Sequence, residues 1–478
     1  MTLDALTLAS TLQTAGRHPT LPFRVALADG RQLDMRRLLR VLPGKRLVGE
    51  AELAGQRVLA KLFIGRRSEK HWRQERAGLE ALVLAGVPTP ALVAAMPIAG
   101  GGHALLTDFL DSAESLAEGW ARVAGRAAAD DEALSILAPA LTMVGRLHAA
   151  GLVQDDLHLA NFLRHDGRLL VIDGDAVRIV SRPQALPMVD ACANLAVLLA
   201  QLPVEWEDRL AVLLPAYRAG AGAVSLDLPV LRGQIARVRA WRLRDFLAKT
   251  VRDCTLFAVE QGFTRFCAVL RQDAEALAPL LAAPDCAISA GQTLKDGGTC
   301  TVTRVLVGDR VLLIKRYNLK GLRHALGRLW RPSRAWHSWQ EGHRLQFLGI
   351  PTPAPLALIE ERCGPLRRRA WLVCEYCPGP NLLAHLSPDQ APPADEARAM
   401  LNLFEAMHRQ RISHGDLKAT NLLWDAGRIL LIDLDAVVQH HLPVAHRHAW
   451  RRDRARLLRN WPAASILRRW LDDHLPAA

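Results

Sequence analysis

The chain has 478 residues, of which 50% are hydrophobic and 23% are charged. This balance is typical of folded globular proteins and excludes a globally disordered chain, and the 33 glycines and 27 prolines follow no period, which excludes a fibrous protein. Because a single core rarely organises so long a chain, we expect two or three domains. Arginine carries most of the net charge of +13, since only 8 of the 61 basic residues are lysines. A lysine inside an apolar strand is therefore conspicuous.

The first residues and the uncharged stretches bear on where the protein acts. An acid stands at position 4, where a secretory signal needs positive charge, so we expect a cytoplasmic protein. Residues 81–107 carry no formal charge and are long enough to span a bilayer, but three prolines and three consecutive glycines would break such a helix. We predict buried strands and turns there. The eight cysteines are dispersed, and Cys374 and Cys377 have no second pair nearby, so we expect reduced thiols rather than a zinc site.

An internal repeat organises the chain. Three pairs of segments recur in the same order: 58–63 with 312–317, 86–90 with 349–353, and 148–177 with 408–437. The last pair aligns without a gap, and 13 of its 30 positions are identical. Self-similarity of this kind predicts two copies of one domain. Ala, Pro and Gly collect near residues 282–295, so we expect the domains to cover residues 1–285 and 286–478.

Strands precede helices in each copy. In the first copy we predict a strand around Lys61, a helix over 72–84, a short buried strand over 169–172 and a helical addition within 204–281. In the second copy the corresponding predictions are a strand around Lys315, a helix over 338–348 and a short strand over 429–432. Strands followed by helices favour an α+β fold over a doubly wound sheet.

The repeated segment has the residues that phosphoryl transfer requires. Such a reaction needs a carboxylate to accept the hydroxyl proton, oxygen ligands for Mg²⁺, and a cation on the phosphates of ATP. Asp416 is followed five residues later by Asn421, and Asp433 comes after a predicted hairpin. We predict that Asp416 orients the acceptor hydroxyl and that Asn421 and Asp433 bind Mg²⁺.

The strand lysine completes this set. We predict that Lys315 binds the α- and β-phosphates and that Glu341, on the next helix, pairs with Lys315. The first copy supplies the same residue types: Lys61, Glu75, Asp156, Asn161 and Asp173. A lone Asp is usually a turn residue and a lone strand Lys usually extends to solvent, but the double occurrence in one order favours function.

Other repeated residues have plainer readings. His148 and His408 precede the Asp-containing loops on predicted helices, and we expect them to pack in the core. Asp175 and Asp435 follow the expected metal ligands by two residues. Either a second metal or a structural hydrogen bond is compatible with that position.

These motifs resemble the protein-kinase-like superfamily, and more closely the bacterial lipopolysaccharide kinases that phosphorylate Kdo or heptose sugars of the inner core. The resemblance rests on His414-Gly-Asp416 with Asn421, on Ile-Asp-Leu-Asp-Ala-Val at 432–437, and on Lys315-Arg-Tyr-Asn with the basic tract after it. It implies two tandem bilobal kinase-like domains, the first with extra C-terminal helices. It also implies ATP and Mg²⁺ as cofactors.

The sequence departs from regulated protein kinases at three places. The residues after Asp173 and Asp433 are Gly-Asp and Leu-Asp instead of Phe-Gly, and no Ala-Pro-Glu segment follows either copy. Neither copy has a complete glycine-rich loop. Gln154 replaces the motif histidine of the first copy, which we expect to leave nucleotide binding intact because that histidine braces the loop.

Two basic tracts suggest an anionic partner. Residues 315–344 contain eight Lys and Arg with one acid, interleaved with Trp330, Trp336 and Trp339, and residues 447–469 contain eight arginines with one acid. One interpretation is a solvated basic face with tryptophans in the core. The other is a surface for phosphorylated lipid A, core sugars and the inner-membrane surface. We expect no nucleic-acid partner, because no nucleic-acid-binding motif is present.

We therefore expect an ATP-dependent kinase of a heptose or Kdo hydroxyl in the lipopolysaccharide inner core, cytoplasmic and peripheral to the inner membrane. A kinase of another small molecule, similar to aminoglycoside phosphotransferases, is the first alternative. A scaffold in which one copy is a pseudokinase is the second. The sequence leaves the sugar, the division of labour between the copies and the oligomeric state open.

Overall fold

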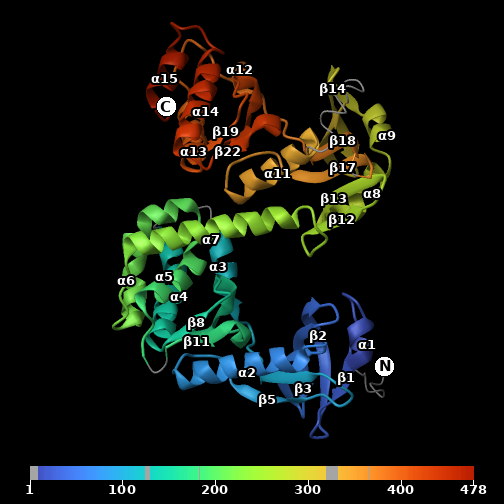
Figure 1. Cartoon of the computed structure of the whole chain (residues 1–478), viewed down its shortest axis with the longest axis vertical. Helices are drawn as coiled ribbons and strands as arrows, with labels where there is room; N and C mark the ends of the chain where they lie inside the picture. Colours follow the sequence, from blue (N-terminus) through green and yellow to red (C-terminus); the bar gives the residue numbers. More distant parts are fainter. Residues whose placement is uncertain (1–8, 124–129, 182–183, 319–331, 365, 478) are drawn as a thin grey trace. The chain divides into compact units, whose positions relative to one another are not determined.

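The computed structural model describes residues 9–123, 130–181, 184–318, 332–364 and 366–477. The chain divides into two compact units, Met1–Ala240 and Trp241–Ala478. The division falls inside the long helix α7 (Leu228–Lys249), which begins in the first unit and ends in the second (Figure 1).

The first unit begins with a six-stranded antiparallel sheet. Its strand order is β1-β2-β3-β4-β6-β5. The strands are β1 (Phe23–Ala26), β2 (Gln32–Leu42), β3 (Arg46–Leu53), β4 (Gln56–Phe63), β5 (Leu92–Pro97) and β6 (His103–Asp108). Side chains alternate along β3 and β4 between buried and half-buried positions, as expected for a sheet with one face on a core. Helix α1 (Ala9–Thr14) contributes Ala9 and Leu12 to that core.

Helices and short hairpins make up the rest of the first unit. The helices are α2 (Ser68–Leu84), α3 (Leu116–Val123), α4 (Asp131–Ala149), α5 (Met188–Leu199), α6 (Leu210–Ala221) and α7, with 3₁₀ helices η1 (Leu159–Asn161), η2 (Gly174–Ala176) and η3 (Val204–Arg209). The short strands are β7 (Glu114–Ser115), β8 (Leu152–Gln154), β9 (Phe162–His165), β10 (Arg168–Val171) and β11 (Val177–Ile179). A second core surrounds α4, whose buried stripe packs on α6.

The second unit has a seven-stranded antiparallel sheet in the order β12-β13-β17-β18-β16-β15-β14. The strands are β12 (Phe257–Gln261), β13 (Arg265–Leu270), β14 (Gln292–Gly297), β15 (Cys300–Val307), β16 (Arg310–Tyr317), β17 (Pro355–Cys363) and β18 (Leu366–Glu375). One face packs on α8 (Ala274–Ala282) and α9 (Pro284–Ala290), and the other on α11 (Arg334–Phe347). The four strands β15-β16-β18-β17 follow the same connectivity as β3-β4-β6-β5.

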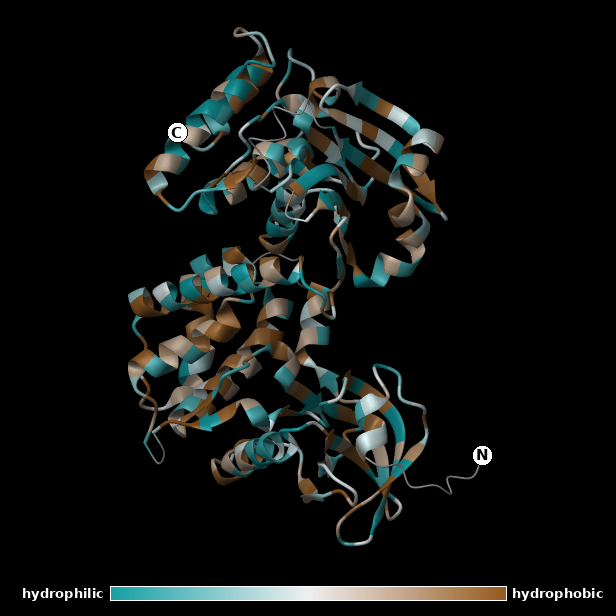
Figure 2. Cartoon of the chain, turned by 45° about the vertical axis from the view of Figure 1, so that its right-hand side comes forward, coloured by the Kyte–Doolittle hydropathy of each residue, from teal (hydrophilic) through white to brown (hydrophobic). Residues whose placement is uncertain are grey.

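The helical part of the second unit is smaller. Its elements are α12 (Leu382–His385), α13 (Ala394–Arg409), β19 (Ile412–Ser413), η5 (Ala419–Asn421), β20 (Leu422–Asp425), β21 (Arg428–Leu431), η6 (Leu434–Ala436), β22 (Val438–Gln439), α14 (Pro443–Leu458) and α15 (Ile466–His474). The core there includes Phe404 and Trp450, both fully buried. Helices near the C-terminus show both hydrophilic and hydrophobic colours (Figure 2), and α14 contains five arginines among its 16 residues.

One expectation about the join needs correction. The region 204–281 was expected to be a helical addition to the first copy. The helices α6, α7 and nearly all of α8 lie within it, but so do β12 and β13, and β13 pairs with β17, from Arg265 with Glu361 to Val269 with Ala357. Strand pairing between distant segments cannot be read from local helical spacing. The division after Ala240 therefore falls ahead of the expected boundary after residue 285.

The mixture of helices and strands fits the expected α+β fold class. The uncharged stretch 81–107 covers the end of α2, then β5 and β6. Nowhere in the described ranges is there a helix with the length and apolar character needed to cross a bilayer.

Candidate active sites

In the first unit, the strand lysine lies among three carboxylates. Lys61 on β4 donates a hydrogen bond to Glu75 on α2 and another, 2.9 Å long, to Asp173. Burial lowers the pKa of Lys61, but attraction to Glu75 and Asp173 outweighs burial, so the pKa is raised. Burial likewise raises the pKa of Glu75, which Lys61 opposes. The predicted ion pair between Lys61 and Glu75 is therefore formed, and together with Asp173 it keeps Lys61 charged.

Close packing of two glycines brings α2 to this position. A Cβ on Gly78 would lie 1.8 Å from the carbonyl oxygen of Gly174, so the helix backbone nearly touches the segment after Asp173. The Gly174 N–H donates a 3.1 Å hydrogen bond to Glu75. Arg46 adds a 2.8 Å ion pair to Asp175. Glycine at 78 and 174 is thus what lets the helix deliver Glu75 to Lys61.

The loop after β8 holds the remaining predicted residues. The Asn161 amide donates 2.8 Å to the Asp156 carbonyl, which fixes the side chain and leaves Oδ1 as its free end. Gln154 donates to the carbonyl oxygens of Ile172 (3.0 Å) and Asp173 (3.3 Å). Asp173 itself is left-handed, with φ of 72°. Gln154 therefore braces the backbone at Asp173 through its amide.

In the second unit, Lys315 on β16 makes a different set of bonds. It donates to Asp433 (2.5 Å) and to Asp435 (3.1 Å). Burial lowers the pKa of Lys315, but the two carboxylates outweigh it and raise the pKa. Both bonds come from the segment after β21, so the lysine is fixed without a carboxylate from α11.

Asp435 is the centre of this arrangement. Its Oδ1 accepts hydrogen bonds of 2.7 Å from both Tyr317 and Ser338, and its Oδ2 pairs with Arg334. Burial raises the pKa of Asp435, but Lys315 and these donors outweigh it, so the pKa is lowered. Of the two roles left open for this residue, the contacts are those of a structural hydrogen-bond acceptor.

The expected pair of Lys315 with Glu341 is not formed. Glu341 accepts a 2.9 Å bond from Arg344, one turn along α11, and burial raises the pKa of Glu341 despite that arginine. Counting back from the repeated Pro-Thr-Pro segment, Ser338 occupies the position of Glu75, and Glu341 that of Gly78. The stretch between the strand lysine and Pro-Thr-Pro is longer in the second unit than in the first. The helix position equivalent to Glu75 therefore lies one turn ahead of Glu341.

The second Asp-containing loop is braced by histidine. His414 Nε2 bonds to the Ile432 carbonyl oxygen at 2.9 Å, which is the interaction that Gln154 makes with Ile172. Asp453 accepts from the backbone N–H groups of His414 and Gly415 at 2.6 and 3.1 Å. The Asn421 amide donates 2.9 Å to the Asp416 carbonyl, as in the first unit.

The two candidate proton acceptors differ in their surroundings. Asp416 pairs with Lys418 at 2.9 Å and with Arg456 at 3.2 Å, and Arg456 also bonds to the Gly415 carbonyl oxygen. The side chain of Asp156 is 76% exposed, and the His158 ring nitrogen lies 3.7 Å from its carboxylate. Sequence reasoning missed Arg456, because it lies on α14, forty residues after Asp416.

The donor atoms suit a hard divalent cation. Glu75, Asp173 and Asp175 each offer a carboxylate oxygen within 4.8 Å of the others, and the described residues of the second unit hold no such group. In each unit the Asn side-chain amide is already engaged, and the backbone carbonyl of the same Asn accepts a hydrogen bond from the residue just before the Asp at the end of a strand. Carboxylate and amide oxygens are the ligands that Mg²⁺ prefers, so both sites fit a nucleotide-bound metal.

The tryptophans and histidines noted in the sequence are mainly structural. Trp339 is fully buried and Trp336 packs against the same core, whereas Trp330 lies outside the described residues. His148 is fully buried between Tyr217 (2.9 Å) and Asn194 (3.1 Å), and burial lowers its pKa to about 4. His408 contacts the rings of His446 and Trp450. These side chains therefore support the core-packing interpretation.

Comparison with known proteins agrees with the second site. Residues 300–469 match the lipopolysaccharide kinase (Kdo/WaaP) family, and this range contains Lys315, Asp416 and Asp433. No curated protein matches the chain. Among solved structures, WaaP in complex with acyl carrier protein is 24% identical over 44% of this chain and 86% of that chain, with a TM-score of 0.30, which does not establish a shared fold.

The family consists of kinases, which use ATP and usually a divalent metal. Its match covers the strand lysine, the Asp-containing loop and the metal-ligand candidates of the second unit. Residues 300–469 are therefore similar to a family of lipopolysaccharide kinases, and the protein is a kinase.

Proposed function

We propose that the second unit transfers the γ-phosphoryl group of ATP to a heptose or Kdo hydroxyl of the lipopolysaccharide inner core. The observation that carries this proposal is the convergence of Lys315, Asp433 and the Asp416–Asn421 loop within the matched range. A kinase of another small molecule uses the same residues, but nothing in the described residues favours a particular one.

Each residue has a role that its contacts support. Asp416 accepts the proton of the acceptor hydroxyl, and Lys315 binds the phosphates of ATP, for which it exchanges its bond to Asp433. Asn421 and Asp433 hold Mg²⁺, which neutralises the charge that develops on the transferred group. His414 and Asp453 keep the backbone of the loop in place. The glycine-rich cover of ATP phosphates in other kinases has no full equivalent here.

The acceptor carries negative charge near the reacting hydroxyl. Arg456 lies 3.2 Å from Asp416, on the side of the loop formed by α14, and two cations on one exposed carboxylate leave guanidinium donors for a further anion. Kdo has a carboxylate, and phosphorylated core sugars have phosphates. Arg456→Gln should raise the acceptor KM about tenfold with little change in kcat. Arg456→Lys should restore part of the lost affinity for the acceptor. An unchanged KM would remove the anionic acceptor from the proposal.

The first unit is a second kinase-like domain that binds Mg-ATP. Its support is the Lys61–Glu75 pair, the three-carboxylate group and the Asn161 bond. Because Asp156 lacks the two cations found at Asp416, a nucleotide-binding unit without acceptor transfer is the specific alternative for this half.

The protein works at the surface of the inner membrane. Leu442 and Val444, at the start of the arginine-rich helix α14, are 68% and 53% exposed. Aliphatic side chains beside basic ones suit an anionic bilayer surface. Binding to vesicles that contain phosphatidylglycerol should fall steeply between 0.05 and 0.5 M salt, concentrations chosen to shorten the screening length from roughly 14 Å to about 4 Å. Binding that resists salt would point to insertion instead.

The decisive experiment uses the purified full chain, radiolabelled ATP and lipopolysaccharide from a strain without core phosphate. Label should enter the sugar core with wild type and be lost with Asp433→Asn. Label in neither case, with ATP binding intact, would contradict a lipopolysaccharide acceptor and favour another small molecule.

A further inference from the structure

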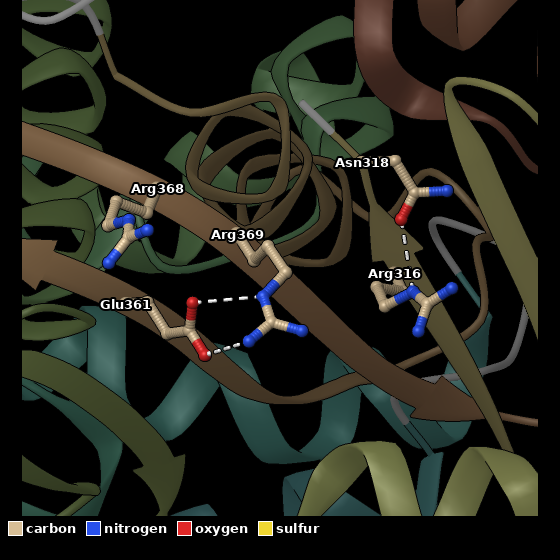
Figure 3. A pocket seen from close by; sticks show the side chains of 5 residues that line it. All are labelled: Arg316, Asn318, Glu361, Arg368 and Arg369. Atoms are coloured by element: carbon tan, nitrogen blue, oxygen red, sulfur yellow. Dashed lines mark hydrogen bonds and ion pairs between the residues drawn. The ribbon is translucent and has the colours of Figure 1, made fainter. Parts of the chain in front are cut away.

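A pocket lined by arginines lies on the sheet of the second unit, away from Lys315. Its volume is about 420 Å³, and the lining residues are Arg316, Asn318, Glu361, Arg368 and Arg369. We call this the arginine pocket (Figure 3). Successive residues of a strand point to opposite faces, so Arg316 points away from the face on which Lys315 meets Asp433. The arginine pocket therefore lies on the face of the sheet that α8 and α9 cover, not at the nucleotide site.

An irregularity in the sheet brings two consecutive arginines to one place. Glu360 pairs with Ala370 and Arg362 with Arg367, so a single residue, Glu361, stands opposite both Arg368 and Arg369. A bulge of this kind turns side chains from their regular alternation, and bulges often aim a side chain at a site. In a regular ladder Arg368 and Arg369 would point to opposite faces.

The charges in the pocket are incompletely balanced. Glu361 binds Arg369 through two hydrogen bonds of 2.9 and 3.0 Å, and Asp285 on α9 binds Arg369 at 2.9 Å and Arg316 at 3.4 Å. Arg368 has no hydrogen bond or ion pair within the described ranges. Three guanidinium groups against two carboxylates leave one positive charge, and Arg368 is the group that carries it.

The orientation of the other groups is fixed in advance. Arg316 donates 3.0 Å to Asn318 and 3.4 Å to Thr301, and the bidentate contact with Glu361 holds Arg369. Figure 3 shows Arg369 against Glu361 and Arg316 against Asn318, with Arg368 extending free of both. Guanidinium groups held in this way recognise phosphate through several N–H donors at low entropic cost. All five lining side chains are polar or charged.

We propose that the arginine pocket binds a phosphate group at a site separate from the nucleotide. The recognising chemistry is that of a phosphate ester or inorganic phosphate, with Arg368 as the adaptable donor and Arg316 and Arg369 as fixed ones. A phosphate held here would tether a phosphorylated lipid or sense soluble phosphate while Lys315 remains available to ATP.

The test compares Arg368→Gln with wild type in the full chain. Titration calorimetry with inorganic phosphate measures the soluble source, and flotation with phosphatidylcholine vesicles containing phosphatidic acid measures the lipid source. Arg368→Gln should weaken binding at least fivefold to one of these probes. A loss with phosphate alone assigns a soluble anion, and a loss confined to vesicles assigns a lipid head group.

Arg398→Gln is the matched control, because Arg398 is an exposed arginine of α13 that pairs with Asp395 at 3.2 Å. This variant should bind both probes as wild type does, and both variants should keep wild-type ATP turnover and melting temperature. Arg316→Gln is a second variant within the pocket. If Arg368→Gln and Arg316→Gln both bind phosphate and vesicles with wild-type affinity, the arginine pocket is not a phosphate site.

Discussion

The two lysines Lys61 and Lys315 occupy equivalent strands, yet they are held by different carboxylates. In the first unit the partner besides Asp173 is Glu75 on α2, and in the second it is Asp435 on the loop after β21. The same residue types thus recur in both units, but the ion pairs that they form differ. A conserved set of residue types does not by itself specify which of them touch.

A single position explains much of this difference. Gly174 follows Asp173 and lets α2 approach until backbone meets backbone, whereas Leu434 follows Asp433 and is buried beside Gly342 of α11. The leucine side chain fills the space that the helix enters in the first unit. With Ser338 at the helix position of Glu75, the buried Asp435 takes over the lysine.

The largest effect should separate the two candidate proton acceptors. Asp416→Asn keeps the shape of the side chain but removes the base, and we expect acceptor phosphorylation to fall about 10³-fold, within the range typical of a lost general base. Asp156→Asn should change it less than threefold, because Asp156 has no lysine or arginine partner among the described residues. The measurement is label transfer to lipopolysaccharide by the full chain. Equal losses in both variants would mean that the units act in one reaction.

The second largest effect should come from disturbing the packing of α2 and α11, the helices next to the strand lysines. Gly78→Ala places a Cβ 1.8 Å from a backbone oxygen, so we expect a loss of about 3 kcal/mol in stability and loss of the Lys61–Glu75 pair. The matched Gly342→Ala places a Cβ 3.0 Å from the Pro355 ring and should cost less than about 1 kcal/mol. Chemical unfolding of both variants measures the difference. Similar losses would show that the close approach at Gly174 is unimportant.

Acid should destabilise both units through buried neutral histidines. Burial lowers the pKa of His148 to about 4 and that of His343 to about 3. Histidine in the unfolded chain has a pKa near 6.5, so above this pH the buried neutral histidines do not reduce the free energy of unfolding. As the pH drops below 6.5, the free energy of unfolding falls, by about 2 kcal/mol per histidine at pH 5. Calorimetry of the full chain at pH 7 and pH 5 measures this.

The same substitution distinguishes the two histidines at pH 7. His148→Phe removes the hydrogen-bond partner of the Tyr217 hydroxyl and one of the two donors to the Asn194 side-chain oxygen, and should destabilise by roughly 1–3 kcal/mol. His343 Nε2 has no partner in the described structure and its ring packs on Trp339, so His343→Phe should be neutral or stabilising. Each variant should also lose its share of the acid sensitivity, and a variant that keeps the full pH dependence would identify another titrating group.

The smallest effect concerns the lysine partners of the second unit. Asp435→Asn removes the centre of the Lys315, Tyr317 and Ser338 contacts, and Mg-ATP affinity should fall about tenfold, or roughly 1.4 kcal/mol. Glu341→Gln should change it less than twofold, because Glu341 pairs with Arg344. Equilibrium binding is measured in an Asp173→Asn background, which silences the first unit. The reverse ranking would restore Glu341 as the lysine partner.

The repeat alone predicted the residues Lys61, Asp156, Asn161, Asp173 and their counterparts, as well as the strands and helices that carry them. Local signals suffice for these, because each motif is short and recurs in one order. The sequence also predicted that Gln154 can take over the bracing role of the histidine, since an amide donates the same hydrogen bond.

Only the tertiary structure decided which residues meet. Glu341 and Ser338 lie on one helix three residues apart, and the packing of α11 places Ser338 against Asp435 while Glu341 pairs with Arg344. Arg456 reaches Asp416 across forty residues, and β13 joins β17 across more than eighty. Contacts over such separations depend on packing and strand pairing rather than on local pattern. The sequence therefore determined the chemistry of the sites, and the fold decided which of their residues contact one another.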